Sequence, residues 1–418
     1  MRATKDSGLE WIGVIPAEWS LSKIGQVYRL RNTKVSDTNY PPLSVTNKGV
    51  VPQLDTAAKT NAHDDRKLVK KGDFAINSRS DRRGSCGISD YDGSVSLINT
   101  ILAPLNEMNP GYYDWLFHTV QFGDEFYKFG HGIVDDLWTT GWQEMKKIII
   151  PTPPLHEQQR IADFLDAKCA EIDALTADIQ TQIDTLEQYK RSVVTETVTK
   201  GLDPDAEMKD SGAEWVGRMP SSWRMLKGKY MFAQRSLRGN SRKLQLLSPT
   251  QKFGVIPQTL YEELSGMSAV KLNEKTDLSL LKTIHKGDFC ISLRSFQGGF
   301  EYSEYEGVVS PAYQVFYPTL EIADDYYKYL FKEQGFIDRM NSYTMTLRDG
   351  KNIAFSDFGN TYIPYPPLTE QLEIASYLDR KCTQIDALVT EKQQQLATLD
   401  EYKKSLIFEY VTGKKEVV

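Results

Sequence analysis

Apolar side chains recur every seven residues in the stretch from 151 to 202, which has no Pro or Gly between Pro154 and Gly201. The repeat consists of Leu165, Ile172, Ile179, Leu186 and Val193, with Leu175, Ile183 and Tyr189 in neighbouring positions. Such a stripe is typical of a coiled-coil helix, on the order of 60 Å long at ~1.5 Å per residue. The pattern predicts a long helix over 153–202 that must pack against another helix.

The same pattern returns near the end of the chain. Residues 364–413 align without a gap to the first stretch, so that Cys169 corresponds to Cys382. The pattern predicts a second long helix, followed by a tail, over 366–418. The residues that we expect to pack the two helices together are Leu165, Ile172, Leu175, Ile179, Leu186, Ile385, Leu388, Leu399 and Leu406.

The duplication covers the rest of the chain as well. Residues 7–19 read SGLEWIGVIPAEW and residues 211–223 read SGAEWVGRMPSSW, while KGDFAINSR at 71–79 corresponds to KGDFCISLR at 286–294. These segments are short, rich in β-branched and aromatic residues, and interrupted by Gly and Asp, which favours strands and turns. We therefore expect an α+β fold with two mixed α/β globules, over 1–152 and 203–365, the second including a polar linker.

Residues 411–413 resemble 198–200, the segment that leads into the second globule. This similarity suggests a circular arrangement in which the end of the second helix lies near the start of the first globule. An antiparallel pair of helices, related by an approximate two-fold axis, would bury both apolar stripes at once. The predicted architecture is thus two repeated globules separated by two long antiparallel helices.

Composition adds few constraints. The 418 residues include 25% charged side chains and carry a net charge of −6, which argues against binding nucleic acid by bulk charge alone. Four cysteines lie far apart, and neither a membrane span nor a signal peptide is evident. We expect a cytoplasmic protein that does not contact a membrane.

The sequence gives little support for a catalytic motif. Residues 129–132 (FGHG) only faintly resemble a methyltransferase glycine loop, and the Pro204–Lys209 segment imitates a nuclease motif with its carboxylates too close together. The five histidines form no ligand-spaced pair, so no metal site is predicted. The sequence favours a binding protein without catalytic residues or a cofactor of its own.

Polar and basic residues in the loops of the two globules could contact DNA. Arginine pairs with guanine, Asn and Gln pair with adenine, and Ser reaches phosphates or bases. The alternative is that each is an ordinary solvated loop residue. The candidates in the first globule are Arg31, Lys34, Thr46, Asn47, Lys48, Asn77, Ser78, Arg79, Arg82 and Arg83; those in the second are Arg235, Arg238, Thr250, Gln251, Lys252, Ser292, Arg294, Ser295, Gln297, Arg348 and Lys351.

The two copies agree best in the helices and differ most in these loops. We interpret this as one task performed twice by the helices and two related but distinct tasks performed by the globules. For a DNA-binding protein, the pattern predicts two different half-sites at a fixed separation.

Taken together, the two PPLxEQ helix starts, the GxEWxGxxPxxW openings and the KGDF strands resemble the specificity subunit (HsdS) of type I restriction–modification systems over essentially all 418 residues. The resemblance implies that each globule is a target-recognition domain reading one half of a bipartite, asymmetric sequence in double-stranded DNA. The helices would set the spacer and dock two methyltransferase subunits.

The resemblance also places the chemistry on partners. It implies S-adenosylmethionine on the methyltransferase subunits, which modify adenine, and ATP and Mg on up to two restriction subunits that translocate and cut DNA. Two other interpretations stay open at this stage. One is the recognition subunit of a related system with a fused nuclease–methyltransferase, and the other is a scaffold that binds proteins only.

Overall fold

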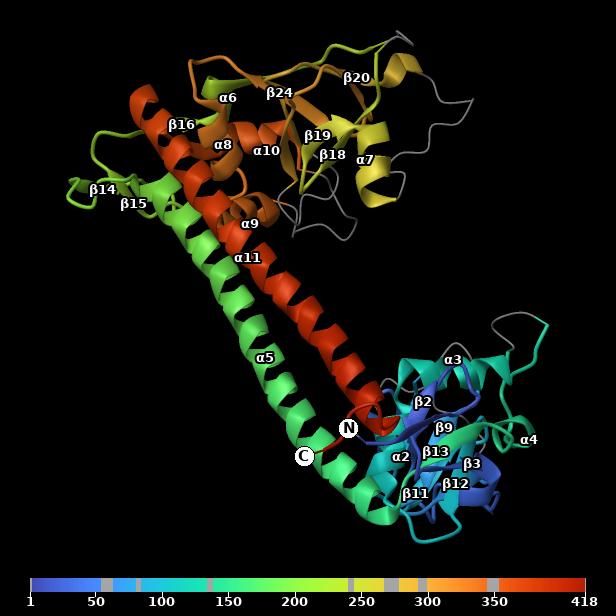
Figure 1. Ribbon diagram of the computed structural model, residues 1–418. Helices are drawn as coiled ribbons and strands as arrows, with labels where there is room; N and C mark the ends of the chain where they lie inside the picture. Colours follow the sequence, from blue (N-terminus) through green and yellow to red (C-terminus); the bar gives the residue numbers. More distant parts are fainter. Residues whose placement is uncertain are drawn as a thin grey trace. The chain divides into compact units, whose positions relative to one another are not determined.

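A computed structural model gives the fold of the chain (Figure 1). It describes residues 2–53, 63–79, 84–133, 138–239, 244–266, 278–291, 299–343 and 353–417. The chain divides into two compact units. Unit 1 comprises residues 1–180 and 393–418, and unit 2 comprises residues 181–392. Each unit therefore combines one globule with parts of both long helices.

Unit 1 contains short strands, short helices and parts of the two long helices. Its strands are β1 (Thr4–Asp6), β2 (Val14–Pro16), β3 (Ser20–Lys23), β4 (Tyr28–Leu30), β5 (Lys34–Val35), β6 (Leu43–Thr46), β7 (Gly49–Pro52), β8 (Arg66–Val69), β9 (Phe74–Asn77), β10 (Cys86–Ile88), β11 (Gly93–Ser96), β12 (Asn99–Pro104) and β13 (Ile149–Thr152). Its short helices are α1 (Ile24–Val27), α2 (Pro110–Phe117), α3 (Val120–Lys128) and α4 (Trp142–Met145).

Antiparallel sheets form the centre of unit 1. The largest has the strand order β10-β9-β12-β4, and a second has the order β11-β8-β5. Strand β13 pairs with β3, so the segment leading into the first long helix is fixed to the start of the globule. Aromatic side chains fill the core, and Trp19, Tyr28 and Phe74 are at most 1% exposed.

Unit 2 repeats this arrangement. Its strands are β14 (Met208–Asp210), β15 (Arg218–Pro220), β16 (Arg224–Lys227), β17 (Phe232–Gln234), β18 (Leu247–Thr250), β19 (Gly254–Pro257), β20 (Lys282–Ile284), β21 (Phe289–Ile291), β22 (Phe300–Tyr302), β23 (Gly307–Val309), β24 (Gln314–Pro318) and β25 (Tyr362–Tyr365). Its helices are α6 (Gly228–Met231), α7 (Gln258–Ser265), α8 (Asp324–Leu330), α9 (Gln334–Ser342), α10 (Phe355–Asn360) and a 3₁₀ turn at Leu278–Leu280. The four-stranded order β17-β24-β21-β22 matches that of unit 1 read in reverse.

The two predicted long helices are confirmed as α5 (Leu155–Lys200) and α11 (Leu368–Val411), drawn in green and red in Figure 1. Helix α5 ends at Lys200, and the following Gly201 has a positive φ of 77°, which glycine adopts readily and other residues adopt only with strain. A Cβ at Gly201 would also lie 2.8 Å from a Glu370 carboxylate oxygen.

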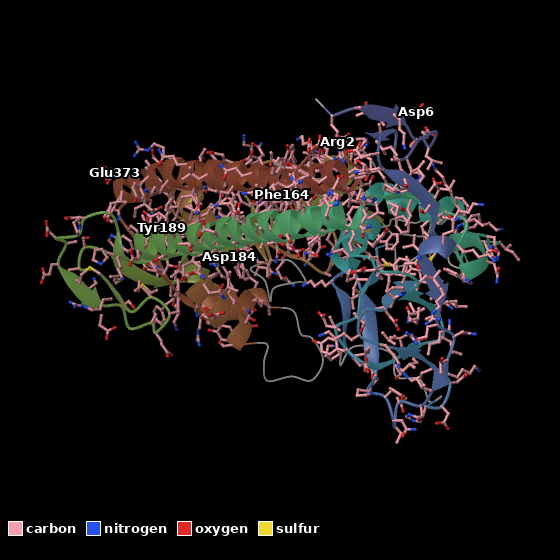
Figure 2. All side chains as sticks on the ribbon, turned by 60° about the horizontal axis from the view of Figure 1, so that its bottom comes forward. Arg2, Asp6, Phe164, Asp184, Tyr189 and Glu373 are labelled. Atoms are coloured by element: carbon pink, nitrogen blue, oxygen red, sulfur yellow. The ribbon has the colours of Figure 1, made fainter. Side chains whose placement is uncertain are left out.

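The helices pack antiparallel within each unit. In unit 1, Phe164 of α5 (labelled in Figure 2) contacts Tyr410 of α11 at 4.4 Å between ring centroids. Lys403 Nζ lies 2.5 Å from an Asp173 carboxylate oxygen. Unit 2 repeats that ion pair with the helices exchanged, since Lys190 of α5 lies 2.6 Å from Asp386 of α11. The expected antiparallel packing is therefore present in both units.

The residues that pack the helices differ in part from those predicted. Leu165, Ile172, Ile179, Ile385 and Leu406 are buried, and Leu186 and Leu399 are partly buried, as predicted. Leu175 and Leu388 are each 47% exposed, so the prediction that they pack between the helices was wrong. The buried positions between Leu165 and Ile179 are instead Cys169 and Ile172. The inward-facing positions alternate at spacings of three and four residues, and the next one after Ile172 is residue 176, directly after Leu175.

Among the described residues, no helix combines the length and the apolar character that a membrane crossing requires.

Candidate nucleic-acid interface

In unit 1 an ion pair holds the start of β9. Arg31, directly after β4, donates from Nε and Nη2 to the two carboxylate oxygens of Asp73 at 2.5 and 2.9 Å. The Asp73 side chain is 2% exposed, and this bidentate bond raises the pKa of Arg31. Asp73 also accepts a bond from the Lys70 amide at 2.8 Å, which fixes the turn before β9. Two guanidinium nitrogens of Arg31 are thus bound within the fold.

Unit 2 contains the same ion pair. Arg235 donates to Asp288 at 2.6 and 2.8 Å, and the Asp288 side chain is again 2% exposed. The guanidinium also lies 4.5 Å from the ring centroid of Tyr317. We predicted DNA contacts for both Arg31 and Arg235. Their geometry instead supports a structural role, because charge-assisted bidentate bonds to a buried carboxylate hold them in place.

Two more candidates are buried at the end of β9. Asn77 is 7% exposed, and its side-chain oxygen accepts a bond from the Arg79 amide at 3.0 Å. Ser78 is 6% exposed, with its hydroxyl 2.8 Å from that of Thr100. Their burial contradicts the expectation of direct DNA contact. Both residues instead shape the loop that begins at Arg79.

Arg79 is exposed and lies on a small backbone ribbon that the sequence analysis missed. It forms an isolated bridge with Thr139, which in turn exchanges two backbone hydrogen bonds of 3.0 Å with His131. Trp138 anchors this ribbon by stacking on Tyr127 at 5.3 Å and donating from its indole nitrogen to the Tyr127 carbonyl. The repeat could have pointed to it, because the predicted site residues 348 and 351 fall at the corresponding place in the sequence, between the segments that form α9 and α10.

The turns of two equivalent hairpins carry further candidates. In β6–β7, Thr46 bonds to the Gly49 carbonyl and accepts from the Lys48 amide, so it stabilises the turn. Thr250 does the same in β18–β19, with bonds to the Gly254 carbonyl and from the Phe253 amide. The remaining candidates in these turns, Asn47, Lys48, Gln251 and Lys252, are exposed at the tips.

The other candidates fall into two groups. Lys34 forms an exposed ion pair with Asp65 at 2.5 Å, and Arg238 is exposed beside β20. Arg82, Arg83, Ser292, Arg294, Ser295, Gln297, Arg348 and Lys351 lie outside the described residues. Of the described candidates, Lys34, Arg79, Arg238 and the hairpin tips therefore have side chains exposed on the surface.

A second exposed feature belongs to the long helices. In unit 1, Leu175 (47% exposed) and Tyr402 (54% exposed) lie within two residues of the Asp173–Lys403 ion pair. In unit 2, Leu388 (47% exposed) and Tyr189 (47% exposed, labelled in Figure 2) lie within two residues of the Lys190–Asp386 pair. Lys381 extends over the Tyr189 ring at 5.5 Å. We call the two sets the unit 1 helix face and the unit 2 helix face.

Reactive groups do not converge in the part of the chain that the structure describes. No group of three or more His, Cys, Asp or Glu side chains there is placed to hold a metal ion. All four cysteines are buried, and burial raises the pKa of Cys169 to about 11. The thiols therefore stay protonated near neutral pH and are poor nucleophiles.

The sequence of the chain matches a known protein family and two relatives. The family described as "Type I restriction modification DNA specificity domain" matches residues 16–185 and again residues 227–398. A putative MjaX specificity subunit of a type I restriction enzyme from Methanocaldococcus jannaschii is 24% identical over 286 residues, which cover 66% of this chain and 61% of the relative. The MjaVIII specificity subunit from the same organism is 25% identical over 348 residues, or 78% of this chain and 76% of the relative.

Solved structures show the same fold. A chain from a structure on complex assembly and conformational transition of the type I R-M system superposes with a TM-score of 0.71 at 15% identity, covering 96% of this chain and 99% of that one. The HsdS subunit from Thermoanaerobacter tengcongensis gives 0.53 at 17% identity, covering 96% and 98%. The two matched regions together account for most of the sequence, one in each half of the repeat. The chain therefore belongs to the type I restriction–modification DNA specificity domain family.

Proposed function

We propose that this chain is the sequence-specificity subunit of a type I restriction–modification complex. Each globule reads one half of a bipartite, asymmetric target in double-stranded DNA, and the long helices set the spacer between the halves. The chain itself performs no catalysis. It directs an adenine methyltransferase and a DNA-cleaving partner to the target.

The observation that carries this proposal is a repeated framework with different exposed side chains. Both units retain the arginine–aspartate pair, and Lys67 and Lys282 each donate to a backbone carbonyl, of Asn99 and Tyr313 respectively. The hairpin turns share a carboxamide and a lysine, Asn47 and Lys48 in one unit and Gln251 and Lys252 in the other, but unit 2 inserts the exposed Phe253 before its glycine. A shared framework with differently built turns suits two readers of different base sequences.

The helix faces support a role in assembly. Each unit exposes one Leu and one Tyr at equivalent positions, and large apolar side chains that recur in this way are typical of a protein-binding surface. Because the two faces carry the same residue types, they fit two copies of the same partner. We propose two methyltransferase subunits at these faces and up to two restriction subunits in the complete complex.

Cofactors then belong to the partners. In this proposal S-adenosylmethionine binds the methyltransferase subunits, while ATP and Mg bind the restriction subunits. None of the described residues of this chain is assigned to any of them.

A genome-wide map of N6-methyladenine in the source strain, with and without this gene, tests the proposal. We expect one bipartite, asymmetric motif to lose methylation on deletion and to regain it when the gene is restored. A map that stays unchanged both in the strain and after co-expression with the methyltransferase subunit would contradict the proposed function.

A further inference from the structure

The turn of the β18–β19 hairpin in unit 2 is one residue longer than the turn of the β6–β7 hairpin in unit 1. The last paired residues are Thr46 with Gly49 in unit 1 and Thr250 with Gly254 in unit 2. Residues 47–48 therefore form the unit 1 turn, and residues 251–253 form the unit 2 turn. Because both turns begin with a carboxamide and a lysine, the additional residue of the unit 2 turn is Phe253.

The backbone of the unit 2 turn is held in place from two sides. The Thr250 hydroxyl donates to the Gly254 carbonyl and accepts from the Phe253 amide, each at 3.0 Å. Gly254 has a positive φ of 70°, and a Cβ there would lie 2.8 Å from the Tyr302 carbonyl oxygen of β22. The hairpin is thus fixed against the sheet directly behind the turn, so that Phe253 is positioned before any ligand binds.

The ring of Phe253 lies outside the apolar core. It is 38% exposed and is not among the residues that form the hydrophobic clusters in the described part of unit 2. The Lys252 ammonium lies 5.2 Å from its ring centroid, and Gln251 is exposed on the same turn. The turn carries no carboxylate. It therefore presents an apolar surface, a carboxamide and a positive charge side by side.

The major groove of DNA offers a matching set of groups. A glutamine carboxamide pairs with adenine, and the thymine opposite presents its C5 methyl group in the same groove, where a phenylalanine ring contacts it. A lysine beside them reaches a phosphate or a guanine. Gln251, Lys252 and Phe253 together thus suit a sequence that contains an A·T pair. The unit 1 turn, with Asn47 and Lys48, has no apolar side chain for a methyl group.

We propose that Phe253 is a specificity-determining residue that contacts the C5 methyl group of a thymine in the half-site of unit 2. This inference rests on the proposed function and deepens it by naming one group on the DNA and the side chain that recognises it. The unit 1 turn makes no equivalent contact. The two halves of the target consequently differ in that only one of them is read through a thymine methyl group at a hairpin turn.

Replacement of thymidine by deoxyuridine tests the inference, because deoxyuridine lacks only the C5 methyl group and keeps the base pairing. The probe is a fluorescent duplex with the motif that the methylome map identifies, in which each thymine of both halves is replaced in turn. Fluorescence anisotropy measures its binding to the full chain in complex with the methyltransferase subunit. At the thymine that Phe253 contacts, we expect loss of the methyl group to weaken binding about fourfold.

Substitutions then connect that methyl group to the ring. Phe253→Ala should bind the thymine duplex and the deoxyuridine duplex equally at this position, while its response at every other thymine stays as in the unsubstituted chain. Phe253→Leu keeps an apolar side chain and should retain part of the preference. Tyr230→Ala is the matched control, since Tyr230 of α6 is an aromatic residue of unit 2 that is 62% exposed, and this variant should retain the full preference.

Two results would overturn the inference. One is a target in which no thymine methyl group affects binding, and the other is a Phe253→Ala variant that keeps every methyl preference of the unsubstituted chain. The ring would then have a structural role beside Leu264 of α7, with which it lines a cavity of about 710 Å³. A complex that binds its motif no better than a scrambled duplex would instead contradict the proposed function, and that result is recognisable without any variant.

Discussion

Arg31 and Arg235 occupy equivalent places in the two units, and each is bonded through two nitrogens to an aspartate that is 2% exposed. Residue type alone made both arginines candidates for guanine recognition. An arginine paired with a buried carboxylate stays bound to it, however, because separation would leave the carboxylate unpaired in the protein interior. These arginines therefore stabilise the strand on which a recognition loop is mounted.

Replacing Arg235 with Ala should lower the free energy of unfolding by about 3 kcal/mol, because Asp288 would stay buried without its partner. Urea denaturation measures the change. Arg238→Ala is the matched control, since the exposed Arg238 should contribute less than about 0.5 kcal/mol. Equal stability of the two variants would contradict the structural role of Arg235.

Replacing Arg79 with Ala should weaken DNA binding and leave the stability of the fold unchanged. The side chain is exposed, and the ribbon below it is held by the backbone bonds of Thr139 and His131. If Arg79 contacts a base, its loss should weaken binding to the cognate duplex by about 1–3 kcal/mol and relax discrimination at one position. Fluorescence anisotropy with matched and singly altered duplexes measures both effects. An unchanged preference at every position would remove Arg79 from the proposed reading surface.

Glu301 makes stability depend on pH. Burial raises its pKa from 4.5 to about 7, so the folded state binds a proton more tightly than the unfolded state. Stability should therefore fall as the pH rises from about 4.5 to 7, by up to about 3 kcal/mol. Glu301→Gln should flatten this slope in urea denaturation at several pH values, and the exposed Glu304→Gln should not. A slope that survives in Glu301→Gln would assign it to another group.

At the scale of the elements, heptad spacing predicted the two long helices and most of the residues between them. Leu175 and Leu388 were misassigned because apolar character alone cannot separate a buried position from the flanking position one residue before it. Only the partner helix decides which positions face inward, and Cys169 and Cys382 take two of them. The exposed leucines are consistent with a second surface that another protein covers.

The loops of the globules were harder to interpret. The sequence placed Asn77, Ser78 and Arg79 after a recognisable strand, but only Arg79 is exposed. The reason is tertiary, since Thr100 and the loop backbone satisfy the other two polar side chains. The bridge between Arg79 and Thr139 was missed because it joins segments separated in the sequence by strands β10 to β12 and helices α2 and α3.

A matched pair of substitutions separates the two surfaces of α5. Ile172→Glu places a charge at a position that is 8% exposed and should destabilise the protein by about 3 kcal/mol or more. Leu175→Glu, three residues later and 47% exposed, should change stability by less than about 0.5 kcal/mol yet weaken binding of the methyltransferase subunit. Circular dichroism and size-exclusion chromatography with light scattering measure the two effects. Normal subunit binding by a folded Leu175→Glu chain would argue against the unit 1 helix face.

At the scale of the whole chain, each unit contains one globule together with part of α5 and part of α11. The Tyr112 hydroxyl donates to the Val411 carbonyl at the end of α11, and the Tyr326 hydroxyl donates to the Val198 carbonyl near the end of α5, each at 2.8 Å. The helix that follows one globule therefore ends on the other globule's framework. A recognition globule is exchangeable only if its replacement retains this bond.

Exchange of the first globule for that of a family member tests whether the two halves read DNA independently. The junction belongs at Pro153 and Pro154, because an earlier cut would divide β13, whose residues Ile149–Thr152 pair with Ser20–Lys23. A tyrosine equivalent to Tyr112 has to be present in the inserted globule. We expect the methylated motif to change in one half only, while the other half and the spacer length stay the same, because unit 2 and both helices are untouched. Methylome sequencing reads both halves at once, and a motif altered in both would show that the units do not recognise DNA separately.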